Sequence, residues 1–180
     1  MKLIFKFLLA VWPVLFAKNS LAQGNAVKTP APIHQILKWE GYWEAQVTLQ
    51  LGDKMSKAIY YADFRKTADG NGMLMYEWCD IPGVGKFNGA NLIGFDPYDG
   101  KIHWYSVDNL GTTHEHIGEF SDEKTFYMEH RSQREGKEYV EKINLEWKDK
   151  NALYVKLTGT LDGKQEEAIE GTFIRKPRRQ

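Results

Sequence analysis

The stretch WEAQVTLQL, residues 43–51, carries an apolar side chain at every odd position and a polar one at every even position. A period of two is typical of a β-strand with one face buried and the other in water. The odd side is again mostly apolar in Tyr139–Trp147, and Leu153, Val155, Leu157 and Leu161 repeat the pattern. The sequence therefore predicts half-buried strands along most of the chain.

Glycine and aspartate mark turns between these segments, as at Gly52-Asp53, Asp108-Asn109-Leu110-Gly111 and Asp162-Gly163. Such residues tolerate positive φ or bond their own backbone, so they favour tight hairpins. One short helix is expected before the first strand, from Pro32 to Lys38. The ten expected strands cover residues 41–51, 56–67, 73–80, 87–95, 101–107, 112–121, 124–134, 137–148, 151–161 and 165–175.

Consecutive hairpinned strands with one wet face each favour closure, because a closed sheet has no exposed edge. We therefore expect an all-β protein, a ten-stranded antiparallel up-and-down barrel over residues 32–176. A barrel of this size is wide enough to hold a small ligand. A sandwich of two sheets is the alternative fold, and the many aromatic residues could also fill the barrel completely.

The first 22 residues have the organisation of a secretory signal peptide. Lys2 and Lys6 precede an apolar run, Phe7 to Ala17, and Ser20-Leu21-Ala22 is a small-x-small cleavage pattern. The run is shorter than the roughly 20 residues that span a bilayer. We expect cleavage after Ala22, a disordered linker over residues 23–31, and a periplasmic or extracellular mature protein without a membrane span.

Charge and cysteine content bear on the possible partners of the protein and on what stabilises its fold. Loss of residues 1–22 removes three lysines and no acid, which leaves 21 basic residues against 24 acidic ones and a net charge of −3. This balance argues against a nucleic-acid partner, which needs a basic surface. The basic tail at residues 177–180 is short and is expected to be solvated. Cys79 is the single cysteine, so the core must supply the stability without an intrachain disulfide.

The opening Gly41-Tyr42-Trp43 resembles the Gly-x-Trp start of lipocalins and their calycin relatives. That resemblance implies that Trp43 plugs one barrel end and that Arg175 packs over it. From Trp39 to Lys176 the chain is similar to a secreted bacterial calycin-type family, domain-of-unknown-function family fifteen seventy-nine. The shared features are Gly94-Phe95-Asp96-Pro97 with Gly100, an aromatic strand with Trp104, and Asp108-Asn109-Leu110-Gly111-Thr112. The family implies a barrel and an exported address, and it carries no known activity.

Three histidines lie close together in the sequence, at His103, His114 and His116. If Asp108 to Gly111 forms the turn between two strands, His103 pairs with His116, and Tyr105 pairs with His114. Directly paired residues share one face of a sheet, and so do residues two apart on a strand. We therefore expect these side chains on one face, pointing inward.

A fourth histidine joins this face if Ser121 pairs with Thr125, because His130 then lies opposite His116. Met128 and Phe126 share the side of His130, which favours an inward orientation. Imidazoles on adjacent strands could bind zinc, copper or iron, with His103, His116 and His130 as the predicted metal ligands. In the calycin-like nitrobindins a histidine near the C-terminal end of the barrel holds haem, whereas no histidine follows His130 here.

Other strands contribute further candidates for lining the interior. An aromatic and polar mixture suits a small, partly apolar ligand held by a few hydrogen bonds. The predicted lining set is Tyr60, Phe64, Met75, Asn91, His103, Tyr105, His114, His116, Met128 and His130.

Signatures of enzymes are absent from the sequence: it has no Gly-x-Ser-x-Gly, no phosphate loop and no Cys-x-x-Cys. Glu77 and Glu129 are candidate acids or bases beside a histidine. The first hypothesis is an exported, non-enzymatic barrel that binds a small apolar or amphipathic molecule without a cofactor. The alternatives are a histidine-coordinated metal or haem protein on the same barrel, and a filled barrel that interacts with partners in the cell envelope.

Overall fold

The computed structural model describes residues 31–178 of the chain. The predicted signal peptide at residues 1–22 lies outside the described residues, and so does the expected linker as far as residue 30. Residues 179–180 at the end of the basic tail lie outside them as well.

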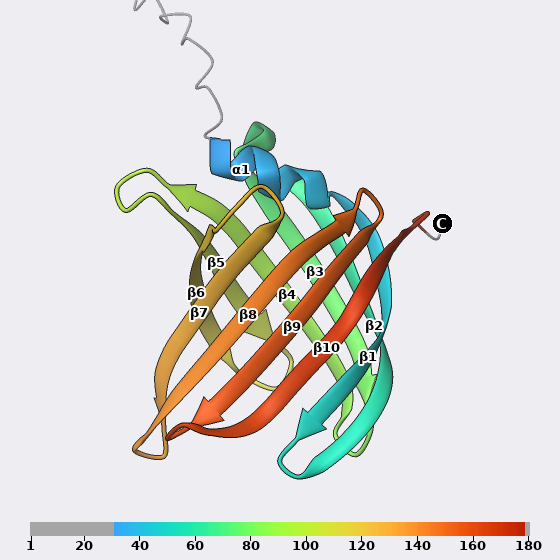
Figure 1. Cartoon of the computed structure of the whole chain (residues 1–180), viewed down its shortest axis with the longest axis vertical. Coiled ribbons are helices and arrows are strands. Elements are labelled where there is room, and N and C mark those ends of the chain that lie inside the picture. The colour runs from blue at the N-terminus through green and yellow to red at the C-terminus, as the bar shows by residue number, and fades with distance from the viewer. Residues whose placement is uncertain (1–30, 179–180) are drawn as a thin grey trace, which may run out of the picture.

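Ten antiparallel strands close into a barrel (Figure 1). Each strand pairs with its neighbours in sequence, and β1 completes the ring by pairing with β10. This confirms the up-and-down barrel and excludes the sandwich. The elements are α1 (Ala31–Ile36), η1 (Leu37–Trp39), β1 (Gly41–Leu51), β2 (Lys54–Thr67), η2 (Ala68–Gly70), β3 (Gly72–Ile81), β4 (Gly85–Asp96), β5 (Lys101–Asp108), β6 (Thr113–Phe120), β7 (Thr125–Arg134), β8 (Lys137–Asp149), β9 (Ala152–Leu161) and β10 (Lys164–Lys176).

The alternation in β1 explains why the sheet curls. Trp43, Ala45, Val47 and Leu49 face the interior and are each at most 3 % exposed. Burial of one large apolar side chain stabilises a fold by roughly 1.5–3 kcal/mol. Because the other strands also have one apolar face, closing the sheet buries these faces together. It also pairs the backbone N–H and C=O groups of the two edge strands with each other.

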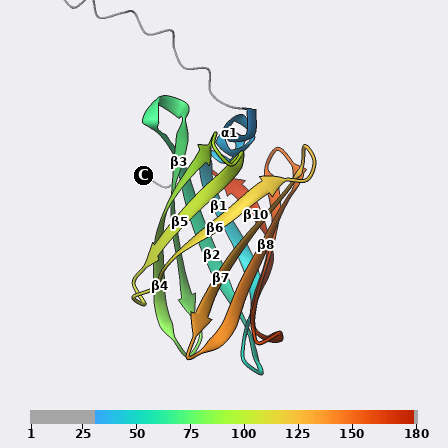
Figure 2. The ribbon, with the colours of Figure 1, turned by 90° about the vertical axis from the view of Figure 1, so that its left-hand side faces the viewer.

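The up-and-down topology gives the barrel two different ends. The helical turns α1 and η1 lead into the start of β1 and cover one end, as the two perpendicular views show (Figures 1 and 2). The turns that follow odd-numbered strands, such as β1–β2 and β3–β4, lie at the opposite end. We call the end covered by α1 and η1 the closed end, and the opposite end the open end.

The helical turns seal the closed end with apolar side chains. Ile33, Ile36 and Trp39 are all 0 % exposed. The indole of Trp39 packs on four aromatic rings at centroid distances of 5.5–6.2 Å, those of Phe64, Trp104, Phe120 and Phe126. The predicted helix at Pro32–Lys38 is thus present, and its function is to cap the barrel.

The last strand is tied to this cap by Arg175. Its guanidinium carbon lies 4.4 Å from the centre of the Trp43 ring. The same group donates hydrogen bonds to the backbone carbonyls of Lys38, at 2.8 Å, and Glu40. The indole N–H of Trp43 in turn donates to the carbonyl of Trp39 at 2.8 Å.

The geometry gives a physical reason for the glycine of the Gly-x-Trp opening. Gly41 has φ +136°, a value that L side chains rarely adopt, and a Cβ there would lie 3.1 Å from Nη1 of Arg175. Only a residue without a side chain lets the chain turn from the cap into β1 beneath the guanidinium.

The hairpin between β5 and β6 is one residue longer than the sequence predicted. Val107 pairs with Thr113, and Thr112 belongs to the turn. The carboxylate of Asp108 stabilises the longer turn, because it accepts hydrogen bonds from the backbone N–H groups of Leu110 at 2.8 Å and Thr112 at 3.1 Å. The change decides which side chains of β5 face inward.

The described part of the basic tail is bound to the barrel wall. Arg178 is exposed, yet its Nε donates to Oδ1 of Asp63 and its Nη2 to the carbonyl of Phe64, both at 3.0 Å. The expectation of a simply solvated tail is therefore corrected at this residue. Among residues 31–178, no helix has both the length and the apolar character needed to cross a membrane.

Candidate ligand-binding site

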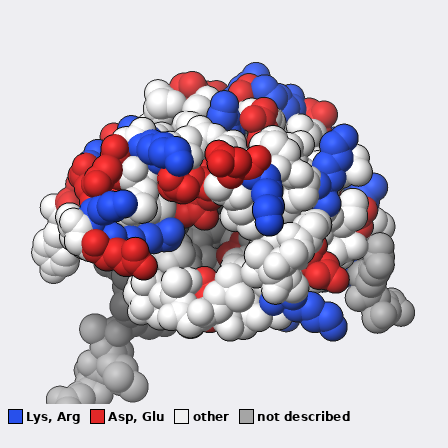
Figure 3. Space-filling view, turned by 90° about the horizontal axis from the view of Figure 1, so that it is seen from below, with Lys and Arg blue, Asp and Glu red and all other residues white. Residues whose placement is uncertain are grey.

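The barrel interior holds a cavity of about 410 Å³. It extends from Trp43, Phe64 and Trp104 beneath the cap to apolar side chains at the open end, among them Val84 and Leu110. Seen from below, the molecule is hollowed at this end, and acidic side chains are visible around and inside the hollow (Figure 3). A volume of this order suits a small organic ligand.

Because the barrel contains this cavity, its interior is not completely filled by side chains, as the filled-barrel alternative required. At the closed end, Trp39 packs among the rings of Phe64, Trp104, Phe120 and Phe126 and fills the barrel. Nearer the open end the walls carry smaller aliphatic residues, such as Val155, Leu157 and Ile169, and leave space between them.

Seven of the predicted lining residues face this cavity: Tyr60, Phe64, Met75, Asn91, His114, His116 and Met128. The imidazole of His130 packs on those of His114 and His116, with ring centroids 5.1 and 5.7 Å apart. The pairing of Ile117 with Glu129 is the β6–β7 register that the sequence predicted. Continued by one residue, it brings His130 beside His116.

The expectation for His103 and Tyr105 was wrong. With the longer hairpin, Trp104 lies opposite His116, and Tyr105 lies opposite Glu115. A shift of one residue sends a side chain to the other face of the sheet. Trp104 therefore points inward, while Tyr105 is 48 % exposed on the outer surface.

His103 takes part in a surface ion-pair cluster instead. Its Nδ1 lies 2.7 Å from Glu115 and its Nε2 lies 2.9 Å from Asp99. The hydrogen bonds to Glu115 and Asp99 raise the pKa of His103 above its ordinary value. Because both ring nitrogens are engaged, His103 cannot serve with His116 and His130 as a metal ligand.

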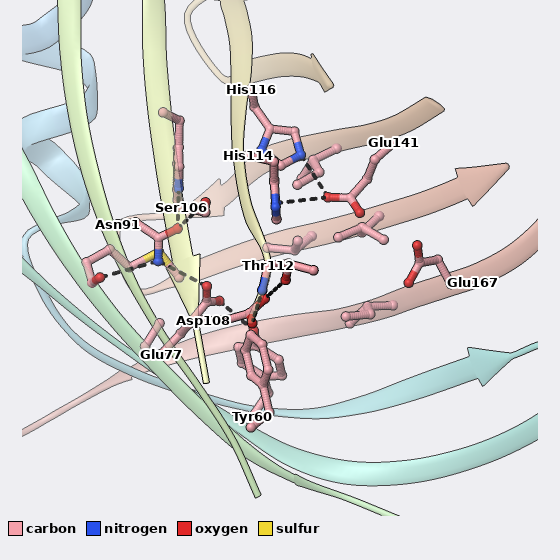
Figure 4. A pocket seen from close by; sticks show the side chains of 18 of the residues that line it. Tyr60, Glu77, Asn91, Ser106, Asp108, Thr112, His114, His116, Glu141 and Glu167 are labelled. Carbon is pink, nitrogen blue, oxygen red and sulfur yellow. Dashed lines mark hydrogen bonds and ion pairs between the residues drawn. The ribbon is translucent and has the colours of Figure 1, made fainter. Parts of the chain in front are cut away.

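Two separate groups of polar side chains face the cavity (Figure 4). The first, which we call the Glu77 group, lies on the wall formed by β2 to β5. The hydroxyl of Tyr60 donates to Oε2 of Glu77 at 2.5 Å, and the amide of Asn91 donates to Oε1 at 3.0 Å. The Asn91 oxygen accepts from Trp104 at 2.9 Å and Ser106 at 2.5 Å.

Burial raises the pKa of Glu77 above its ordinary value, although the hydrogen bonds from Tyr60 and Asn91 oppose the shift. The negative charge of Glu141 raises it further. Desolvation and the neighbouring Glu77 also raise the pKa of Tyr60. This wall therefore favours neutral groups that can donate or accept hydrogen bonds.

The second group, which we call the His–Glu group, comprises His114, His116 and Glu141 on the opposite wall (Figure 4), together with Tyr139, which binds Glu141. Nε2 of His116 lies 2.7 Å from Oε1 of Glu141, and Nε2 of His114 lies 4.0 Å from the same oxygen. The hydroxyl of Tyr139 donates to Oε2 at 2.6 Å. It also contacts Glu167, and Gly159 leaves the space for this contact, because a Cβ there would collide with Glu167.

Electrostatics in this group favour a charged Glu141 beside a neutral His114. Burial alone would raise the pKa of Glu141, but the hydrogen bond and charge of His116, with the Tyr139 hydroxyl, bring it below the ordinary value. Burial lowers the pKa of His114 despite the attraction of Glu141. A neutral imidazole next to a carboxylate can accept a proton or a metal ion.

The cavity as a whole is acidic. Among the described residues, four lining carboxylates, those of Glu77, Asp108, Glu141 and Glu167, face a single arginine, Arg134. Arg134 ends β7 at the open end, where its guanidinium lies over the Tyr139 ring and 3.4 Å from Glu167. The deeper cavity therefore disfavours an anion.

Sequence reasoning missed Glu141 and Tyr139, and it treated Glu77 only as a candidate acid or base. The available signal was the interruption of alternation: Glu141 and Glu77 stand on the apolar faces of their strands, where an acid needs a polar partner. Glu129, the other candidate acid or base, does not line the cavity. It lies on the outer face with Tyr127 and Arg131.

The fold is similar to a known barrel. The S-type phycobiliprotein lyase CPES from Guillardia theta is 10 % identical in sequence, and the likeness covers 87 % of this chain and 99 % of that chain at a TM-score of 0.55. At this identity the likeness shows a shared barrel fold and nothing of the chemistry. No family model matches the chain. No curated protein is detectably similar to it.

Proposed function

We propose that this chain is an exported, lipocalin-like barrel that holds a small amphipathic molecule in its interior. The observation that carries the proposal is the cavity of about 410 Å³, sealed at one end and open at the other. Ligand pockets in proteins are typically concave and mostly apolar, with a few well-placed polar groups. The wall of this cavity has that composition.

The walls also indicate what kind of molecule fits. Phe64, Trp104 and Phe173 offer an apolar surface beneath the cap, and Leu157 and Ile169 continue it toward the mouth. The Glu77 group and the His–Glu group supply hydrogen-bonding atoms on opposite walls. A ligand with an apolar body and a neutral or cationic polar group fits both features. A carboxylate or phosphate group would instead be repelled by the four acidic side chains that line the cavity.

The exported address rests on sequence alone. The positive start, apolar run and cleavage pattern of residues 1–22 are typical of a secretory leader. The resemblance to family fifteen seventy-nine is part of the same proposal and points to the same compartment. N-terminal sequencing of the protein from a periplasmic extract should begin at Gln23; recovery of the intact leader in the cytoplasm would contradict the address.

Ligand binding can be tested with one fluorescent probe and two competitors of equal chain length. The neutral probe N-phenyl-1-naphthylamine should bind saturably, and dodecylamine should displace it at lower concentration than dodecanoate does. Native mass spectrometry of protein from its own host should show added mass from a retained ligand. Equal displacement by amine and acid would contradict the proposed ligand charge.

A matched pair of variants on β10 separates the cavity from the outer surface. Ile169→Trp fills the cavity wall, while Ile174→Trp adds the same ring to the outer face of the same strand, where Ile174 is 39 % exposed. The first variant should lose probe binding and the second should keep it. Binding that survives Ile169→Trp and disappears in Ile174→Trp would place the site outside the barrel.

A further inference from the structure

The members of the His–Glu group lie on β6 and β8, and the register of the intervening strand β7 aligns them. His130 pairs with Glu141 across β7 and β8. The β6–β7 register places His116 next to His130 on the other side. Side chains from neighbouring strands in one row point to the same face, and His114 lies two residues before His116 on that face.

Three donor atoms of this group converge on one point inside the cavity. His114, His116 and Glu141 each offer a ligand atom, and these atoms all lie within 4.8 Å of one another. Figure 4 shows both imidazoles directed at the Glu141 carboxylate. We propose that His114, His116 and Glu141 form a binding site for a divalent transition-metal ion, with Zn²⁺ as the ion best suited to it.

The distances suit such an ion after a small adjustment. Zinc binds imidazole nitrogen and carboxylate oxygen at about 2.0–2.2 Å, so its tetrahedral ligands lie about 3.3–3.5 Å apart. The separations of His116 and His114 from Oε1 of Glu141, 2.7 and 4.0 Å, fall on either side of that value. Side-chain rotations that change each separation by about 0.6–0.7 Å would bring both to that value.

The surroundings hold the donors in place. His116 is 2 % exposed and Glu141 is 8 % exposed, so both rotamers are restricted by packing. The Tyr139 hydroxyl binds Oε2 of Glu141 and leaves Oε1 directed at the histidines. Outer partners of this kind orient metal ligands and tune their basicity.

The donor set also leaves room for a fourth ligand. Two histidines and one carboxylate with an open position are typical of catalytic zinc sites, whereas structural zinc sites use four protein ligands. All three residues line the cavity. The fourth position therefore faces the space in which water or the polar group of a bound molecule lies. Because the strands alone create the site, it does not depend on the proposed amphipathic ligand.

A second cluster provides a natural control. Asp96, Asp99 and His103 also bring ligand atoms within 4.8 Å of one another, on the outer surface. There, however, both ring nitrogens of His103 are bound to carboxylates, Nε2 to Asp99 and Nδ1 to Glu115. Because neither nitrogen is free to bind a metal ion, this cluster should not bind one.

The test uses the full mature chain, stripped of metal with a chelator and titrated with Zn²⁺ by calorimetry. One equivalent should bind, and Co²⁺ in its place should give the strong visible absorption of a low-symmetry site. His114→Gln and Glu141→Gln should each weaken Zn²⁺ binding by more than the roughly 10- to 100-fold expected from losing an outer partner. Tyr139→Phe should weaken it by roughly 10- to 100-fold.

The His103→Gln variant should bind Zn²⁺ like the wild type. Absence of Zn²⁺ binding to the wild type would overturn the proposal, as would loss of binding in His103→Gln with retention in His114→Gln. Circular dichroism checks that each variant folds, and a Zn²⁺-dependent rise in melting temperature should be present in the wild type and absent in His114→Gln. If His114→Gln does not fold, Tyr139→Phe and the Co²⁺ spectrum decide the outcome.

Discussion

The closed and open ends of this barrel are made from the same ten strands and serve opposite purposes. At the closed end, Trp39 is fully buried among aromatic rings, and Arg175 binds the cap to the last strand. Toward the open end, Glu77 and Glu141 stand on the inner wall around a cavity. The difference indicates that one half of the interior supplies stability while the other half keeps polar groups available for binding.

The sharpest test of this contrast is Trp39→Ala. Removal of a fully buried large aromatic side chain typically destabilises a protein by about 3–5 kcal/mol, because the lost contacts are not replaced. We expect a loss of that size in the free energy of unfolding, measured by urea denaturation followed by circular dichroism.

Ile169→Ala is the matched change at the open half. Ile169 already faces the cavity, so its truncation removes fewer contacts, and we expect a loss of about 1 kcal/mol. An equal loss in the two variants would mean that stability is spread evenly along the barrel, with no difference between its two ends.

Arg175→Met tests how the closed end is held together and should cost less than Trp39→Ala. The variant keeps much of the apolar stem over Trp43 but removes the cation–π contact and leaves the carbonyls of Lys38 and Glu40 without this donor. We expect a loss of about 1–3 kcal/mol in the free energy of unfolding. The control is Arg131→Met, since Arg131 forms exposed ion pairs on the outer face that contribute about 0–1 kcal/mol. Equal losses would mean that the guanidinium does not tie the strand to the cap.

The smallest effect should come from Glu77→Gln and should depend on pH. Burial raises the folded-state pKa of Glu77 above its ordinary 4.5. The unfolded carboxyl therefore ionises first as the pH rises, and the folded wild type loses stability through the interval above 4.5. Glutamine stays neutral, so the stability of the variant relative to wild type should increase as the pH rises above 4.5, and level off once Glu77 is ionised in the folded state as well.

Denaturation at several pH values measures this trend, with Glu123→Gln in the exposed β6–β7 turn as the control. The control should follow the pH profile of the wild type. A difference between Glu77→Gln and wild type that stays constant, or shrinks, as the pH rises would indicate that Glu77 is not desolvated and that the open half is wetter than its packing suggests.

Much of the fold was accessible from sequence because the signals are local. The alternation of β1, the turn residues and the helix before Gly41 each act within a few residues, and together they indicated a ten-stranded barrel. The inward orientation of His114 and His116 followed from the same logic, since charged residues occupy the other side of β6.

The candidate site was predictable only in part. His103 and Tyr105 were placed inside because the β5–β6 turn was expected to be one residue shorter. The carboxylate of Asp108, which binds backbone N–H groups within the turn, stabilises the longer loop. A side-chain hydrogen bond of this kind does not alter the hydrophobic pattern, so the pattern could not reveal it.

By itself the sequence determined that the chain forms hairpinned strands with one apolar face, because period and turn chemistry are properties of neighbouring residues. Only the tertiary structure decided that Glu141 meets His116, 25 positions away, with His130 between them. Such meetings depend on the register of three strands at once. A single residue in one turn changes that register without changing the pattern of any strand.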